Sequence, residues 1–194
     1  MTMENDELKI SHKILGIDPG TAVMGYAVLG TKLNKSEVEG IGVVQMKGLP
    51  DHYAKLKHIF ERITALIEQY QPDILAIEAP FYGKNVQSML KLGRAQGIVI
   101  AVCLHAGMEV FEYEPRKIKQ SITGNGNAAK EQVAAMLGHM YPLDDLPDFL
   151  DATDALAAAV CHHLQCSPAL KTGSSRKFNS WKSFVLDNEK RIVR

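Results

Sequence analysis

The sequence lacks any apolar run near the ~20 residues that would cross a bilayer, and residues 1–13 are polar rather than a charged cap on an apolar signal segment. It has only three cysteines, Cys103, Cys161 and Cys166, with no C-x-x-C pair. Neither a disulfide framework nor a structural zinc site is therefore indicated. Internal repeats are also missing. With 194 residues and 46% hydrophobic content, we expect one main folded domain in a soluble, cytoplasmic protein.

Net charge is absent too, because 22 basic and 22 acidic side chains cancel. The charges are unevenly distributed, since residues 171–194 hold seven bases against two acids. Residues 84–130 also hold more bases than acids, namely Lys84, Lys91, Arg94, Arg116, Lys117, Lys119 and Lys130 against three acids. This pattern fits a surface that follows a phosphate backbone, and equally well ordinary solvated helix faces. Charge alone does not identify the partner.

Short apolar runs at 14–18, 24–29 and 41–46 predict three strands in an antiparallel meander, with a turn at Pro19-Gly20. Helical spacing of apolar residues follows from Tyr53 to Tyr70 and ends before Pro72. Residues 74–78 predict a fourth strand, 85–105 a long helix and 110–113 a fifth strand. This order indicates a mixed-sheet α/β domain with helices on both faces.

The pattern after Pro115 is helical and is broken by the turn signal Gly124-Asn125-Gly126. Asn127 is a candidate N-cap for a helix through residue 140, and a last helix is expected over 148–165. We divide the chain into an N-terminal extension (1–12), one α/β domain (13–166) and a basic tail (167–194) that we expect to be mobile.

Four acids stand out by position. Asp18 and Glu78 each end an apolar strand, where a desolvated carboxylate is costly unless a cation or hydrogen-bond donors compensate it. Asp151 and Asp154 are three residues apart on the last helix and so share a face. If the two strands are parallel neighbours, all four carboxylates meet at one edge of the sheet. Each acid alone also has a structural interpretation, as a turn former, a loop acid or a residue of a first helical turn.

A cluster of carboxylates favours a hard cation such as Mg²⁺ or Mn²⁺ over zinc. Metal would also relieve the repulsion between the acids. Two ions about 3.5–4 Å apart can activate water and stabilise the leaving oxygen of a phosphodiester. The pattern therefore predicts metal-assisted phosphodiester hydrolysis.

Five segments in order resemble the signatures of RuvC-type Holliday-junction resolvases, over about residues 13–165. They are ILGIDPGT at 14–21 with Gly25-Tyr26, AIEAPF at 76–81, KLGRAQG at 91–97, the lysines Lys119 and Lys130, and DATDALA at 151–157. The first segment alone is weak, because G-I-D-x-G-T also opens the phosphate loop of actin-like ATPases. Five in order are specific.

The resemblance implies an RNase H-like fold with a five-stranded mixed sheet, and a homodimer that nicks four-way DNA junctions symmetrically in recombination and repair. It also implies a branch-migration complex as partner. The positions that match the family's catalytic and metal-binding acids are Asp18, Glu78, Asp151 and Asp154, with two Mg²⁺ ions per site for which Mn²⁺ substitutes. The family's dimer contact involves the helix that here carries Gly93-x-x-x-Gly97, where small residues need a packing reason.

The resemblance also assigns DNA contacts. Phe81 matches an aromatic residue near the junction centre, where it would stack on a base. Lys119 and Lys130 match basic residues beside the scissile phosphate, and the neighbouring side chains Lys84, Arg116 and Lys117 would widen the positive strip. One departure is that Ala-Pro follows the glutamate where other members often have Gln-Val, which leaves loop geometry and sequence preference open.

Three alternatives remain. An actin-like phosphotransferase would need a second lobe and a second phosphate loop, which the sequence does not display. A junction-binding protein without catalysis would require one of the four acids to be replaced, and none is. An RNase H-like nuclease acting on another structured nucleic acid is compatible with everything in the sequence.

Overall fold

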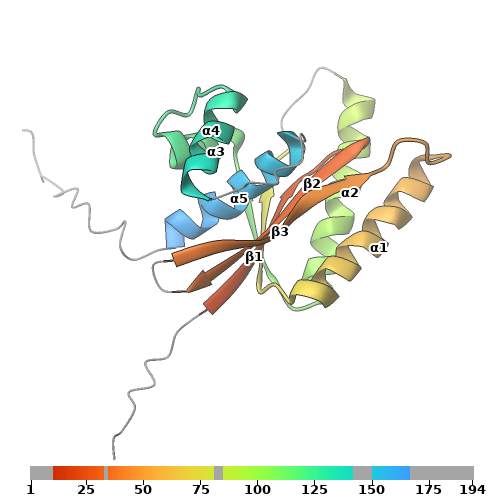
Figure 1. The fold of residues 1–194 in the computed structure, drawn as a ribbon. Helices are drawn as coiled ribbons and strands as arrows, with labels where there is room; N and C mark the ends of the chain where they lie inside the picture. Colours follow the sequence, from red (N-terminus) through yellow and green to blue (C-terminus); the bar gives the residue numbers. More distant parts are fainter. Residues whose placement is uncertain (1–10, 33–34, 81–84, 142–149, 167–194) are drawn as a thin grey trace, which may run out of the picture.

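The computed structural model describes residues 11–32, 35–80, 85–141 and 150–166 (Figure 1). Its elements in chain order are β1 (Ser11–Asp18), β2 (Val23–Lys32), β3 (Lys35–Gln45), α1 (His52–Tyr70), β4 (Ile74–Glu78), α2 (Val86–His105), β5 (Glu109–Tyr113), α3 (Pro115–Thr123), α4 (Lys130–Met140) and α5 (Leu150–Cys166). The expected terminal extension and basic tail lie outside the described residues, apart from positions 11 and 12 in β1. No helix in the described ranges is long and apolar enough to cross a membrane.

The five strands form one sheet of order β3-β2-β1-β4-β5. β1 pairs antiparallel with β2 and β2 with β3, whereas β1–β4 and β4–β5 are parallel. Helices α1 and α2 cover one face, and α3, α4 and α5 cover the other (Figure 1). The predicted meander, mixed sheet and two helical layers are confirmed.

Alternation along the strands decides which face each acid occupies. In β1, Leu15 and Ile17 pack into the core under α1 and α2, whereas Ile14 packs into the core under α5. Because side chains alternate with a period of two, Asp18 lies on the same face as Ile14. The same count along β4 places Glu78 on the face of Ala76, which is also in the α5 core. Both acids therefore face α5.

Helix α5 is buried on nearly every side, and its small side chains allow it to lie close to the sheet. An ideal Cβ at Gly16 would stand 2.1 Å from the Ala155 carbonyl oxygen, and one at Gly25 would stand 1.8 Å from the Asp151 carbonyl oxygen. No side chain fits at either position. These two glycines fix the height of α5 above β1 and β2, and with it the position of the acids on α5.

One prediction about a helix start is wrong. Helix α4 begins at Lys130, with Ala129 rather than Asn127 in the N-cap position, and the Ala129 N–H donates to Gln132 Oε1 at 2.9 Å. Asn127 instead belongs to the preceding turn, where its N–H donates to Asn125 Oδ1 at 3.0 Å. The turn starts at Gly124, whose φ of 74° ends α3. The Asn125 side chain prolongs the turn and delays the helix.

Candidate active site

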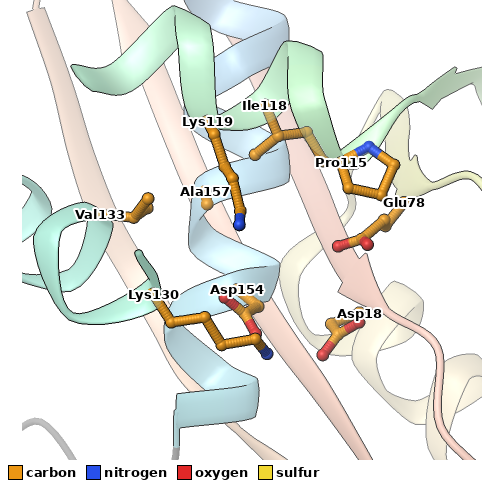
Figure 2. Close-up of a pocket in the computed structure, with 9 residues that line it drawn as sticks. All are labelled: Asp18, Glu78, Pro115, Ile118, Lys119, Lys130, Val133, Asp154 and Ala157. Atoms are coloured by element: carbon orange, nitrogen blue, oxygen red, sulfur yellow. The ribbon is translucent and has the colours of Figure 1, made fainter. Parts of the chain in front are cut away.

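Asp18 and Glu78 come together because of strand register. The parallel β1–β4 ladder pairs Ile17 with Ile77, so the next residue of each strand is one of the two acids. Asp154 reaches the same place from α5. A pocket there is lined by Asp18, Glu78, Pro115, Ile118, Lys119, Lys130, Val133, Asp154 and Ala157 (Figure 2).

Two lysines enter this pocket from the helices above it. Lys130, the first residue of α4, forms an ion pair with Asp154, and its side chain is about half exposed. Lys119 projects from α3 into the pocket, and the ammonium group of Lys130 lies between Asp154 and Asp18 (Figure 2). The site therefore combines three acids with two bases, between walls of apolar side chains.

Burial, and to a smaller extent the nearby charges of Glu78 and Asp154, raise the pKa of Asp18 from 3.8 to about 7, while Lys130 opposes the shift. A carboxyl with this pKa is only partly ionised near neutral pH. The metal-free site is therefore short of positive charge, despite its two lysines.

The pKa of Glu78 is also raised, first by burial and then by Asp154, with Lys130 and Lys119 acting in the opposite direction. Burial alone would lower the pKa of Lys130, but its hydrogen bond to Asp154 and the surrounding carboxylates raise it overall. Lys130 is therefore a permanent cation among the acids.

The donor set suits a hard divalent cation, because all three acids offer oxygen and burial makes their ionised forms unfavourable without a counter-charge. In the described part of the chain, however, no three His, Cys, Asp or Glu side chains already stand close enough together to hold a metal ion. The pocket therefore has suitable oxygen ligands, but they are too far apart to hold an ion as they stand. Metal binding would require them to draw together around the ion.

Asp151, the fourth predicted acid, does not line the pocket. It is half-buried in the first turn of α5, one turn before Asp154, and its charge contributes the smallest of the increases in the pKa of Asp18. Its backbone carbonyl lies against Gly25. The structure thus brings together three of the four predicted acids and leaves the fourth at the margin.

The predicted DNA contacts divide into three groups. Lys119 and Lys130 line the pocket. Arg116 and Lys117 are exposed on α3; Arg116 lies against Gly126, and the Lys117 ammonium stands 5.3 Å from the centre of the Tyr113 ring. Phe81 and Lys84 lie outside the described residues, so their roles stay predictions.

Two residues outside the predicted site touch the backbone beside the acids. Lys55 Nζ on α1 donates to the carbonyl of Thr21, which follows Asp18 by three residues, at 2.9 Å. Gln96 Nε2 on α2 donates to the carbonyl of Glu78 at 3.4 Å. Gln96 could have been noticed, because it is a polar residue at a buried position in the phase of Val99 and Cys103.

The sheet order, the two helical layers and the acidic pocket at the carboxyl ends of β1 and β4 define an RNase H-like α/β protein. A family model described as "Crossover junction endodeoxyribonuclease RuvC" matches residues 14–162. The chain belongs to this family of nucleases.

Curated relatives with the same family name resemble the chain over almost its full length. A protein of this name from Bacteroides fragilis is 52% identical over 182 residues, covering 92% of this chain and 95% of the relative. One from Cytophaga hutchinsonii is 48% identical and covers 99% and 94% of the two chains. Among solved structures, Thermus thermophilus RuvC in complex with a Holliday junction substrate matches with a TM-score of 0.75 and 29% identity, over 82% of this chain and 97% of that one. The yeast mitochondrial resolvase Ydc2, at 12% identity and a TM-score of 0.58, shares the fold.

Proposed function

We propose that this protein is a structure-selective endonuclease that resolves four-way DNA junctions by symmetric, metal-dependent phosphodiester hydrolysis in recombination and repair. The observation that carries the proposal is the convergence of Asp18, Glu78 and Asp154 with Lys119 and Lys130 in one pocket of a RuvC-family chain. The match to a family member in complex with a Holliday junction substrate supports the same substrate here.

Asp18, Glu78 and Asp154 are the proposed metal ligands and catalytic acids, joined by Asp151. Asp151 is on the same helix as Asp154 and already contributes to the field at Asp18, so a small movement of the first turn of α5 would add it to the set. Divalent Mg²⁺, for which Mn²⁺ would substitute, supplies Lewis acidity for the attacking water and the leaving oxygen. Two ions per site fit this number of oxygen ligands.

The two pocket lysines have a different task, because a phosphodiester brings negative charge into an already acidic site. Lys119 and Lys130 would hold a phosphate oxygen and reduce the repulsion between DNA and the carboxylates. Arg116 and Lys117, exposed on α3, would extend this contact along the backbone, with Lys84 and Phe81 as further proposed contacts. None of the basic side chains needs to read base sequence.

Two nicks on opposed strands need two active sites, which a two-fold homodimer supplies. One face of α2 is suited to the contact, because it is exposed along its whole length and apolar or small. Its members are Val86, Leu90, Gly93, Gly97, Ala101 and Leu104. An added Cβ at Gly93 or Gly97 would meet nothing within 4 Å in this chain, so both positions leave room for a partner helix.

Two expectations follow from family membership. A branch-migration complex that moves the junction is the proposed protein partner, and the cytoplasm is the proposed place of work.

A nuclease of the same fold acting on another structured nucleic acid is the nearest alternative. The test is side-by-side cleavage of a mobile four-way junction, a linear duplex, a flap and an RNA–DNA hybrid with Mg²⁺. Paired symmetric nicks in the junction alone support the proposal. Preferred cleavage of the flap or the hybrid would replace it with the alternative.

A further inference from the structure

Gln96 is a buried polar residue that the catalytic scheme above does not use. Only 4% of it is exposed, and it lies on the sheet-facing side of α2 beside Ala95 and Val99. Its side-chain amide donates to the backbone carbonyl of Glu78, the last residue of β4. Since Glu78 directs its carboxylate toward α5, Gln96 reaches the same residue from the opposite face of the sheet.

The direction of the Glu78 carbonyl follows from the hydrogen bonds of β4. The Glu109 N–H donates to the Asp73 carbonyl, and the Ala79 N–H donates to the Tyr113 carbonyl, both at the β5 side. Backbone groups along a strand point alternately to its two neighbours. From the Asp73 carbonyl onward, the odd-numbered residues therefore bond to β5, and the carbonyl of Glu78 points toward β1.

The β1 strand cannot provide the donor for that carbonyl. The parallel register pairs Ile17 with Ile77 and, continued by one residue, places Asp18 opposite Glu78. In a parallel ladder the carbonyl of a residue accepts from the N–H one position beyond its partner. That position is Pro19, which has no N–H. The ladder thus loses a bond at the two acids.

We propose that Gln96 is a positioning residue for Glu78, with its side-chain amide standing in for the backbone donor that Pro19 lacks. The missing ladder bond would leave the end of β4 free to shift relative to β1, and with it the distance between the two carboxylates. Gln96 holds the Glu78 carbonyl instead. This inference rests on the proposed metal-dependent nuclease function, in which that distance matters.

A second helix holds the other strand end in the same way. Lys55 on α1 donates to the carbonyl of Thr21, in the turn that follows Asp18 and Pro19. Lys55 and Thr21 line a small hollow together with Ala95, the neighbour of Gln96 on α2. Both strand ends that carry acids are therefore anchored from the α1–α2 layer, on the side away from the pocket.

The test is a double-substitution cycle on the full chain. Gln96→Met keeps an unbranched side chain but removes the donor, and Pro19→Ala restores the backbone N–H.

Gln96→Met should lower kcat for junction nicking by about 10- to 100-fold, as expected for misplaced reacting groups, with junction affinity unchanged. It should also weaken Mn²⁺ binding measured by calorimetry without DNA. The double variant should recover most of both losses. Gln69→Met, the same change at an exposed position of α1, should match wild type.

Recovery by Pro19→Ala separates positioning from simple packing, because an added N–H on β1 cannot fill a defect on α2. Wild-type behaviour of Gln96→Met, or losses that Pro19→Ala leaves uncorrected, would overturn the proposal.

If Gln96→Met does not fold, the single variant Pro19→Ala is used instead, and hydrogen exchange of the backbone amide that it introduces at position 19 is measured. We expect this amide to be protected, because it faces the Glu78 carbonyl. Rapid exchange would contradict the proposal. If wild type nicks no junction, the proposed function fails, while Mn²⁺ binding and amide exchange still decide the role of Gln96.

Discussion

The Lys130 ammonium on α4 forms an ion pair with Asp154 on α5, inside the pocket that Asp18 and Glu78 also line (Figure 2). The Lys130 ammonium thus lies among the carboxylates, in the position where a bound metal ion would place its positive charge. Lys130 opposes the rise in the pKa of both Asp18 and Glu78. Its positive charge and the proposed divalent cation would therefore compete for the same acids.

Replacing Lys130 should therefore affect metal-free protein and metal binding in opposite directions. Lys130→Met should lower stability without metal by about 0.2–1 kcal/mol, a modest amount because the Lys130 side chain is half exposed to water. It should tighten Mn²⁺ binding, because the competing ammonium is gone. Thermal unfolding and calorimetry measure the two effects, with Lys130→Arg as the control that keeps the charge. Equal Mn²⁺ affinity in Lys130→Met and wild type would refute the competition.

The pKa of Asp18 predicts how stability without metal depends on pH. Its folded pKa, about 7, is above the value of 3.8 for an isolated group, so the folded state holds a proton that the unfolded state has lost. Stability should therefore fall as pH rises from about 4 to 7. Asp18→Asn should remove this part of the decline and raise Tm at pH 8 by roughly 2–4 °C, the shift that about 1 kcal/mol produces in a chain of this size. A Tm below that of wild type at pH 8 would contradict the assigned cause.

Gly25 is expected to tolerate no side chain. In Gly25→Ala the new Cβ would meet the Asp151 carbonyl oxygen, so the first turn of α5 must move. We expect a loss of about 1–3 kcal/mol in the free energy of unfolding, together with a fall in nicking, since Asp154 moves with the helix. Denaturant unfolding and a nicking assay measure both. Gly138→Ala, where an added Cβ meets nothing within 4 Å, should instead stabilise α4 by up to about 1 kcal/mol.

The exposed stripe on α2 predicts the oligomeric state. Leu90→Asp places a charge in the middle of the proposed two-fold contact and should convert the dimer to a monomer, as measured by light scattering. Met140→Asp, at another exposed apolar residue on α4, should leave the dimer intact. If the Leu90→Asp protein remains a dimer, the dimer contact lies on a different surface.

Much of the fold could be predicted because each strand contains a short apolar run and because helix spacing is regular. The runs at 24–29 and 41–46 underestimate β2 (Val23–Lys32) and β3 (Lys35–Gln45), whose outer parts are polar. Strand 74–78 and the turn at Gly124 appear in the structure where the pattern placed them. The helix start after Asn127 was missed because Asn favours turns as well as N-caps, and its neighbour Asn125 decided between them.

The site was predictable only in part, for a physical reason. Acids at strand ends stand out in a sequence because burial makes them unfavourable, which identified Asp18 and Glu78. The roles of Gln96 and Lys55 depend on backbone carbonyls, which every residue has, so no side-chain pattern predicts these roles, although the position of Gln96 in the buried phase of α2 marks it as an unusual polar residue. Whether Asp151 joins Asp154 depends on the closeness of α5 to Gly25, a tertiary contact that local spacing does not contain.

The most direct test of the proposed function is nicking of a synthetic mobile four-way junction by purified protein with Mg²⁺, beside linear duplex and the Asp18→Asn variant. Glu112→Gln, which removes an exposed acid on β5, is the matched control. We predict paired symmetric nicks with wild type and Glu112→Gln on the junction alone, and at least about 100-fold slower nicking with Asp18→Asn at unchanged or tighter junction binding. Equal nicking by Asp18→Asn, or tight junction binding by wild type without any nicking, would contradict the proposed function.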